Sequence, residues 1–388
     1  MIDIEKMKDR CYGCMACKNV CPAGCIKTIT DNEGFYYPTI DKAQCLDCGL
    51  CEKVCIAEGS LKSLDAKGSF QSLHNESNKE AYWVKHKETE KILKSSSGGA
   101  FTAFAAKMTD ENGVVFGAVF DAFSKTIKHE STLNVILEKL KKSKYCESNI
   151  DMTYQEIKKI LDLNRKVMFV GTPCQCAGLI SFLGKEDGNL FLVDFVCHGV
   201  PSTSCMQAYI AYQEKKNKSK VINIDMRAKD HGWDKMRVKV VFKNGKEFLF
   251  NGTTDIYMSN FFQNTFLRKS CYHCEFTKNH KSDITLADFW GYKAYDANLN
   301  KDNTGISLVV CNTEKGIDFF NSIKEKVDFG MVPYDKFEYI YQRNQSEYNR
   351  NERENFIKKV KKAGLFRAMR SYRNKHVIRI LKSRILGK

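Results

Sequence analysis

Eight cysteines in the first 55 residues follow one spacing twice. The pattern C-x2-C-x2-C-x3-C recurs 34 residues further along the chain. The two runs are Cys11, Cys14, Cys17, Cys21 and Cys45, Cys48, Cys51, Cys55. Three thiolates separated by two residues can converge from one tight loop, and a run with this spacing is typical of the ligands of a 4Fe-4S cluster. The sequence therefore predicts two 4Fe-4S clusters, and residues 1–58 must fold so as to hold them.

In proteins with two such runs, the fourth cysteine of each run binds the cluster of the other run. This assigns Cys11, Cys14, Cys17 and Cys55 to one cluster, and Cys45, Cys48, Cys51 and Cys21 to the other. A pair of zinc sites or a disulfide scaffold is the alternative, but zinc sites usually pair two separated C-x2-C hooks. The segment resembles the bacterial-type two-cluster ferredoxins, although Ile56 replaces the proline that often follows the last cysteine. Cys25 has no place in either set, and we expect it to be a small buried apolar residue.

Composition indicates the cellular compartment in which the protein works. The chain has 388 residues and 17 cysteines, and cysteines that bind metal require a reducing compartment. Residues 1–10 are charged and lack the apolar core of a signal peptide, and no run of about 18 apolar residues exists to span a membrane. We therefore expect a cytoplasmic protein.

The positive charge is concentrated at the C-terminal end. The net charge is +16, and residues 358–388 contain 12 Lys or Arg and no Asp or Glu. Three interpretations remain open: a solvated charged helix, peripheral contact with an anionic membrane surface, or docking of an acidic partner such as ferredoxin. Nucleic-acid binding is not expected, because no recognition module accompanies the charge.

Hydrophobic patterning divides the chain into four parts. Residues 1–58 are the two-cluster unit, 59–79 a polar linker, 80–341 an α/β domain with a mixed sheet, and 342–388 a basic helical tail. Short apolar runs alternate with helical patterns in the third part, and Asn244-Gly245 predicts a hairpin there. Strands are expected at 82–86, 114–120, 167–170, 191–197, 221–226, 238–242, 247–250, 284–286 and 307–311. Helices are expected at 100–107, 133–141, 154–161, 174–183, 202–216, 256–267 and 314–324.

Four more cysteines lie where a site could form. Cys271 and Cys274 form another C-x2-C, and Cys174 and Cys197 each follow a predicted strand. Open α/β sheets place ligand sites at the carboxyl ends of strands, so these cysteines could hold a third cluster. A redox-active pair and half a zinc site are also compatible with this spacing. Cys146, Cys176, Cys205 and Cys311 are expected to lie in the core.

A loop rich in serine and glycine, residues 95–99, precedes the predicted helix 100–107. Small residues before a helix expose backbone N–H groups, which can bind phosphate. A capped helix that follows a flexible loop is the alternative.

Several motifs together resemble the coenzyme F420 hydrogenase/dehydrogenase beta-subunit family. They lie, in order, at residues 96–102, 142–145, 169–175, 193–201, 268–274 and 283–291. Members of this family are iron–sulfur flavoproteins that bind FAD and exchange electrons with a second substrate, coenzyme F420 in some members. Cys176 departs from the family pattern, where Val is more usual.

The resemblance implies site residues. A third 4Fe-4S cluster would be bound by Cys174, Cys197, Cys271 and Cys274. Residues near FAD would be Ser97, Gly98, Gly99, Thr102, Lys144, Gly171 and Thr172. Lys144, His198 and Asp288 are candidates for tuning the flavin or for protonating a substrate.

These observations lead to one functional hypothesis and two alternatives. We expect an oxidoreductase that takes electrons from ferredoxin or another redox protein, passes them through the clusters to FAD, and reduces a small organic acceptor. The first alternative is an electron-transfer subunit of a larger complex that has no substrate of its own. The second is a dehydrogenase that oxidises reduced F420 and reduces ferredoxin. An oligomer is compatible with each of these.

Overall fold

The structure is a computed structural model that describes residues 7–58, 79–341 and 350–385. Its centre is a mixed sheet of nine strands in the order β14-β3-β13-β12-β8-β7-β4-β5-β6. Strands β12, β8, β7 and β4 run parallel to one another, whereas β3, β13 and β14 are paired antiparallel. The strands are β3 (Glu80–His86), β4 (Val114–Asp121), β5 (Thr126–Ser131), β6 (Ser148–Asn149), β7 (Val167–Val170), β8 (Leu190–Phe195), β12 (Ile284–Asp288), β13 (Ser307–Cys311) and β14 (Val327–Val332). The predicted α/β class with a mixed sheet is confirmed.

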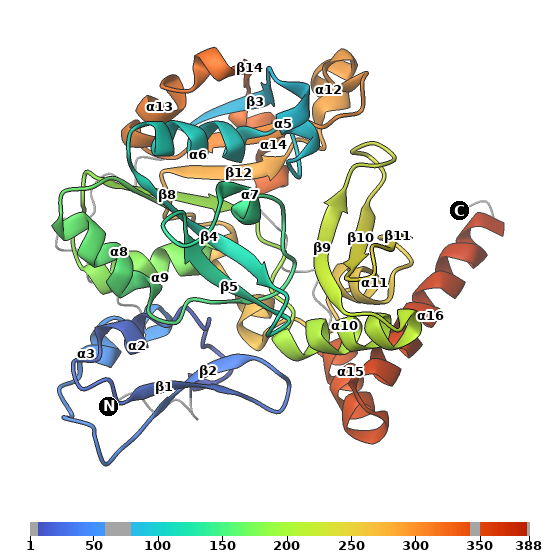
Figure 1. Cartoon of the computed structure of the whole chain (residues 1–388), viewed down its shortest axis with the longest axis horizontal. Coiled ribbons are helices and arrows are strands. Elements are labelled where there is room, and N and C mark those ends of the chain that lie inside the picture. Colours follow the sequence, from blue (N-terminus) through green and yellow to red (C-terminus); the bar gives the residue numbers. More distant parts are fainter. Residues whose placement is uncertain (1–6, 59–78, 342–349, 386–388) are drawn as a thin grey trace.

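Helices cover both faces of this sheet (Figure 1). Val167 and Phe169 of β7 pack against α8 (Thr153–Asp162) and α9 (Pro173–Leu183) on one face. Met168, which lies between them, packs with α6 (Ala100–Asp110) and α13 (Glu314–Asn321) on the other face. Successive side chains of a strand point to opposite faces, and the central strands are apolar on both faces because both are covered.

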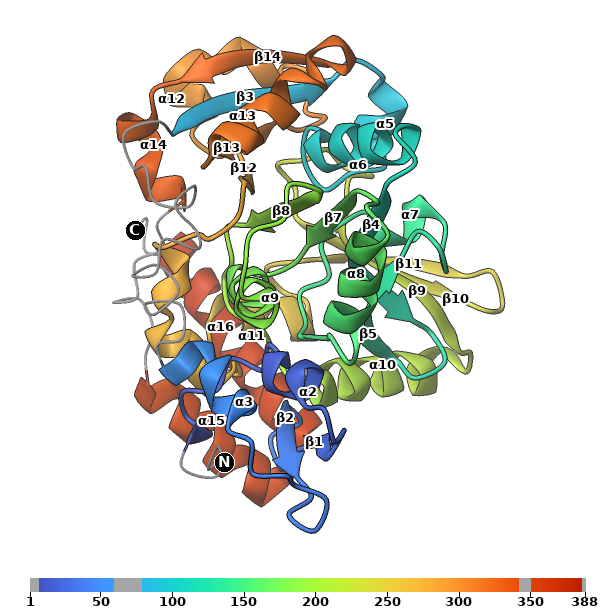
Figure 2. The ribbon, with the colours of Figure 1, turned by 90° about the vertical axis from the view of Figure 1, so that its left-hand side faces the viewer.

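The N-terminal unit, residues 7–58, lies against α8 and α9 (Figures 1 and 2). Its elements are α2 (Ala16–Val20), β1 (Ile26–Thr30), β2 (Tyr36–Ile40) and α3 (Leu50–Lys53), and β1 and β2 form an antiparallel hairpin. The side-chain amide of Gln155 on α8 donates to the carbonyl oxygen of Asn19 over 2.6 Å. The hydroxyl of Ser181 on α9 donates to the carbonyl oxygen of Val54 over 3.0 Å. The predicted linker, apart from Lys79, lies outside the described residues.

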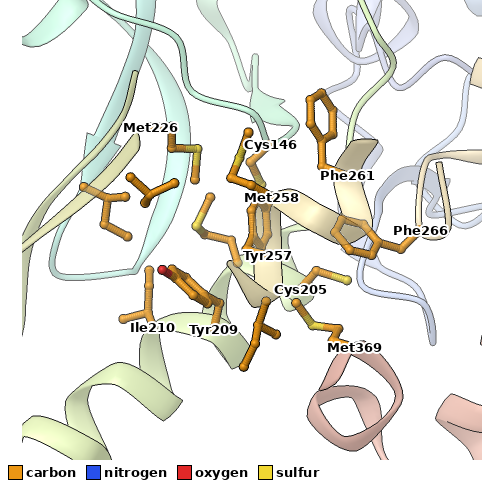
Figure 3. Packing of buried hydrophobic residues seen from close by; sticks show 14 of the residues in the cluster. Cys146, Cys205, Tyr209, Ile210, Met226, Tyr257, Met258, Phe261, Phe266 and Met369 are labelled. Atoms are coloured by element: carbon orange, nitrogen blue, oxygen red, sulfur yellow. The ribbon is translucent and has the colours of Figure 1, made fainter. Parts of the chain in front are cut away.

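A second sheet contains β9 (Val221–Ala228), β10 (Arg237–Phe242) and β11 (Glu247–Asn251), all antiparallel. Strands β10 and β11 are the hairpin predicted from Asn244-Gly245. Helices α10 (Thr203–Asn217), α11 (Ile256–Phe262), α15 (Arg350–Ala363) and α16 (Leu365–Ile385) surround a core beside this sheet, part of which appears in Figure 3. Cys146, Cys205, Cys176 and Cys311 are all buried, as expected.

The basic tail is helical in its described part, residues 350–385. Ala368, Met369 and Tyr372 of α16 are buried in the core beside α10 and α11, and Figure 3 shows Met369 near Phe266. The first half of α16 therefore packs inside the molecule. Ile378 and Leu381, further along the helix, are exposed. Among the described residues, no helix has the length and apolar character needed to cross a membrane.

Some expected elements differ in the structure. The helix expected at 256–267 ends at Phe262, because Asn264 adopts a left-handed conformation (φ 58°) that ends a helix. Only α7 (Leu137–Leu140) forms within 133–141, because the chain first turns where Asn134 N and Val135 N both bond to Ser131 O. Strands β5, β6 and β14 were not expected.

Candidate functional site

The proximal set of cysteines is Cys11, Cys14, Cys17 and Cys55, all in the N-terminal unit. The structure brings these four together. Burial raises the pKa of Cys14, and the neighbouring thiols of Cys17, Cys11 and Cys55 raise it further. Gly13 and Met15 adopt positive φ angles of 68° and 60°, which fold the loop tightly enough for its cysteines to converge. The set combines three cysteines of the first run with one of the second, as the spacing predicts.

The distal set is Cys21, Cys45, Cys48 and Cys51. All four line one pocket in the N-terminal unit. The backbone N–H of Asp47 points to Cys45 Sγ at 3.4 Å, and Gly49 provides a positive φ of 71° in the same loop. Cys48 is exposed, so this site lies at the protein surface.

The inner set is Cys174, Cys197, Cys271 and Cys274, from three separate segments. Cys174 lies in the first turn of α9 directly after β7, and Cys197 lies two residues beyond β8. Because β7 and β8 are parallel, these two cysteines emerge at the same edge of the sheet. Cys271 and Cys274 belong to a 3-10 turn, η4 (Lys269–His273), and the residue after it. Burial and the nearby thiols of Cys174, Cys271 and Cys197 raise the pKa of Cys274.

The three sets form a continuous row. Gly178 of α9 faces Cys14 so closely that a Cβ at this glycine would lie 2.9 Å from the sulfur. Cys174 is one turn away on the same helix. Tyr12, in the proximal loop, is half-buried beside Cys274 and Cys174, and its ring packs edge-on against Phe276 at 5.0 Å. At the other end, Cys17 of the proximal set is electrostatically coupled to Cys51 of the distal set.

The donor atoms suit iron–sulfur clusters. Burial raises the pKa values of the Cys11, Cys17 and Cys55 thiols, so a positive group is needed to hold them as thiolates. The irons of a cluster supply that charge. Within the described ranges, no three His, Cys, Asp or Glu side chains are grouped as one metal ion would need. Ligands that each bind a different iron atom stand further apart than ligands that share one ion.

The loop before α6 is held mainly by the protein itself. Ser97 Oγ donates to Ile306 O over 2.6 Å, and Gly98 N donates to Ser307 Oγ over 2.9 Å. A Cβ at Gly98 would lie 2.2 Å from Val84 O, so only glycine fits there. Gly99 begins α6 with φ 92°, and the Thr102 hydroxyl is buried 3.0 Å from that of Ser95. Contacts within the protein therefore explain why glycines and hydroxyl residues stand at these four predicted flavin positions.

Gly171 and Thr172, the other predicted flavin residues, lie next to the inner set. Thr172 caps α9 through a capping box with Gln175, and its hydroxyl is 3.1 Å from Cys174 Sγ. A pocket beside Thr172 and Cys174 extends to Tyr12 and Arg268. This end of β7 therefore connects the predicted flavin residues to the cysteine row.

The three candidate catalytic residues lie around Tyr145. Lys144 precedes it, and Asp288 is near enough to raise its pKa. The ring of Tyr145 is 4.9 Å from that of Phe261, which is 4.5 Å from the ring of His198. Burial lowers the pKa of Lys144 to about 7, despite the opposing effect of Asp225. Its Nζ donates to the carbonyl oxygens of Lys139 (2.9 Å) and Lys141 (2.5 Å).

Sequence reasoning missed Arg227 on β9. Its side chain contacts both the serine-rich loop and the segment that contains Asp288 and Trp290. It is 3% exposed, pairs with Asp288 at 3.1 Å, reaches Ser96 O at 3.5 Å, and lies over the Trp290 ring at 5.3 Å. Its Nε has no hydrogen-bond partner among the described residues. A buried guanidinium with a spare donor fits a bound ligand that carries an acceptor group, as FAD does. The signal was a pair of basic residues, Arg227 and Lys229, at the end of an apolar strand.

Lys229 was also missed. Its Nζ donates to three carbonyl oxygens, those of Ile92 (2.7 Å), Ser97 (2.5 Å) and Thr304 (2.7 Å). It therefore fastens the serine-rich loop to the segment before β13. Ser96 connects the same loop to the next motif, since Ser143 N donates to its hydroxyl over 2.8 Å.

Comparison with known proteins identifies two segments of the chain. Residues 164–336 match the family described as the C terminus of the coenzyme F420 hydrogenase/dehydrogenase beta subunit. Residues 10–58 match the 4Fe-4S dicluster domain. An uncharacterized protein of the rpl9-rpl11 intergenic region of Porphyra purpurea is 37% identical over 57 residues, which are 14% of this chain and 73% of that protein.

A solved structure is also similar to the chain. A chain of the F420-reducing NiFe hydrogenase complex from Methanosarcina barkeri aligns with a TM-score of 0.45 and 13% sequence identity. The alignment covers 73% of this chain and 91% of that one.

Proposed function

We propose, from the premise that this chain joins a 4Fe-4S dicluster domain to the C-terminal domain of the coenzyme F420 hydrogenase/dehydrogenase beta-subunit family, that it is an iron–sulfur flavoprotein oxidoreductase. Its donor would be a ferredoxin-type protein and its acceptor a small organic molecule. The observation that carries the proposal is the contact between Cys14 and Gly178. This contact sets the proximal cysteines beside the helix that presents Cys174.

The proposal assigns residues to each cofactor. The proximal, distal and inner sets would each hold one 4Fe-4S cluster. FAD would be held by residues near the Ser96–Ser143 contact and at the carboxyl end of β7, together with Arg227. When bound, the clusters supply single-electron transfer and the flavin supplies exchange between one- and two-electron chemistry.

The chain's own residues then have defined tasks. Tyr12 and Phe276 exclude water from the space between the proximal and inner sets. Thr172 directs its hydroxyl to Cys174 Sγ and keeps α9 in register with β7. Lys144, with a pKa of about 7, would hold or release a proton at Nζ near neutral pH.

Anaerobic purification from a flavin-replete host tests the proposal. We expect bound FAD and about twelve iron atoms per chain, at four per cluster. An iron content of about eight atoms per chain would correspond to two clusters and would contradict the proposed inner cluster. Protein that lacks flavin after this purification would instead be an electron-transfer subunit without its own substrate.

Single substitutions assign the inner cluster to its residues. Cys274→Ala should lower the iron content by about four atoms per chain and leave the signals of the other two clusters intact. Cys176→Ala is the matched control, because Cys176 is fully buried on the same helix as Cys174 and is not in the set. Reduction with ferredoxin, F420 or NAD(P)H, followed by visible and paramagnetic-resonance spectra, would then identify the donor.

A further inference from the structure

A fifth cysteine lines the distal pocket. Cys25 is buried as expected, with 2% of its surface exposed. It lines the same pocket as the distal set, and its Sγ lies 3.4 Å from Cys21 Sγ. It therefore belongs to the cysteine site rather than to an apolar core alone.

A tight turn between the two cysteines produces this contact. Gly24 N donates to Cys21 O over 3.2 Å, and Gly24 adopts a positive φ of 58°. The turn reverses the chain just before β1, so Cys25 comes back beside Cys21. Asp41 N donates to Cys25 O over 2.9 Å, which fixes the backbone of Cys25 at the start of the hairpin. The position of the second thiol is thus set by the backbone.

We propose that Cys25 is a reserve ligand of the distal cluster, able to take the position of Cys21. The inference rests on the proposed function, because it requires that the distal set holds a cluster. When Cys21 binds iron as a thiolate, it can only accept a hydrogen bond, so the Cys25 thiol donates to it. When Cys21 is missing, Cys25 releases its proton to water and forms the Fe–Sγ bond. In this step the S–H bond of Cys25 breaks, the Fe–S bond forms from the thiolate electron pair, and no electron is transferred.

Alanine variants of the full chain test the proposal. Alanine is used because a serine oxygen could itself bind iron. Cys21→Ala and Cys25→Ala should each retain the iron content of the parent, whereas the double variant should lose about four iron atoms per chain. Cys205→Ala, at a buried cysteine that belongs to none of the three sets, is the control and should retain all iron. The paramagnetic-resonance signal of the proximal cluster reports that the double variant is folded.

The outcomes separate the inference from the proposed function. If Cys21→Ala loses as much iron as the double variant, Cys25 cannot replace it and the inference is wrong. If Cys25→Ala alone loses the cluster, Cys25 is a primary ligand and the reserve role is likewise refuted. If the parent protein contains no distal cluster, the proposed function fails at this site and the inference fails with it.

A redox titration of iron-loaded protein gives a second measurement that does not depend on cluster loss. A hydrogen bond to a ligand sulfur stabilises the more negative, reduced cluster and so raises its midpoint potential. Cys25→Ala removes the donor and should lower the potential of the distal cluster, whereas Cys25→Ser retains a donor and should stay closer to the parent. Equal potentials in the parent and Cys25→Ala would show that the thiol does not donate to Cys21.

Discussion

Arg268 and Glu147 form an ion pair of 2.6 Å whose side chains are only 2% and 6% exposed. The same guanidinium donates to Tyr36 O over 2.7 Å, and it lies 4.6 Å from the centre of the Tyr37 ring. Arg268 stands three residues before Cys271 in the chain. One buried residue therefore attaches β2 of the N-terminal unit to the segment that carries half of the inner set.

Removal of this charge should destabilise the protein strongly. Arg268→Met leaves Glu147 buried without a cation, and we expect a loss of about 3–5 kcal/mol in the free energy of unfolding. Anaerobic denaturation with urea measures this. Arg10→Met is the control, because Arg10 pairs with Glu58 at the surface, and should change stability by about 1 kcal/mol or less. A double variant, Arg268→Met with Glu147→Leu, should be less destabilised than Arg268→Met alone; equal losses would contradict the importance of the pair.

A methyl group at Gly178 should disturb the proximal set. In Gly178→Ala, the added Cβ would lie 2.8 Å from Cys14 Cβ and 3.1 Å from the hydroxyl of Tyr154. We expect a loss of about 1–3 kcal/mol in stability and a changed paramagnetic-resonance spectrum of the proximal cluster. At Gly188 the added Cβ would have no neighbour within 4 Å, so Gly188→Ala should match the parent. Identical spectra for both variants would refute the proposed proximity.

Lys144 should give the protein a pH-dependent stability. Burial lowers its pKa from 10.5 to about 7 in the folded state. Between these values the unfolded chain binds a proton that the folded chain does not, so the free energy of unfolding rises with pH, by up to about 1.4 kcal/mol per pH unit.

Lys144→Met should remove this rise, as measured by denaturation at several values from about pH 7 to 9. Lys139→Met, at an exposed position, should retain the parent profile. The prediction is wrong if the profiles of the parent and Lys144→Met run parallel.

The two halves of α16 should differ in their contribution to stability. Met369 is fully buried, so Met369→Ala should cost about 2–5 kcal/mol. Ile378 is 52% exposed, and Ile378→Ala should change stability by about 0.5 kcal/mol or less. Thermal or urea unfolding of the two variants measures the difference. A similar small effect for both would mean that α16 does not dock on the core.

Local spacing explains why the grouping of the cysteines into sets could be predicted. The proximal and distal sets follow from cysteines a few residues apart, whose convergence depends on one loop and one repeat. Cys174 and Cys197 were found because parallel strands such as β7 and β8 end at the same edge of a sheet. The hairpin at 237–251 was predictable from its turn residues, Asn244-Gly245, for the same local reason.

Features that depend on distant pairing could not be predicted. Arg227 and Arg268 are charged residues whose burial is possible only because Asp288 and Glu147 come from other parts of the chain. Strand β14 is an edge strand with mixed polarity, so its sequence alone does not distinguish it from a loop. The helical period of α16 was visible in the sequence, but the groove that receives Met369 is formed by α10 and α11.

Strand β3 pairs with β13 and β14, which lie more than 200 residues further along the chain. During synthesis, the central sheet therefore stays incomplete until residue 332 has emerged, whereas the distal and proximal sets are complete once residue 55 has emerged. The inner set must wait for Cys274. If the three sets bind clusters as proposed, iron could be loaded from the N-terminus onward while the rest of the chain is still being made.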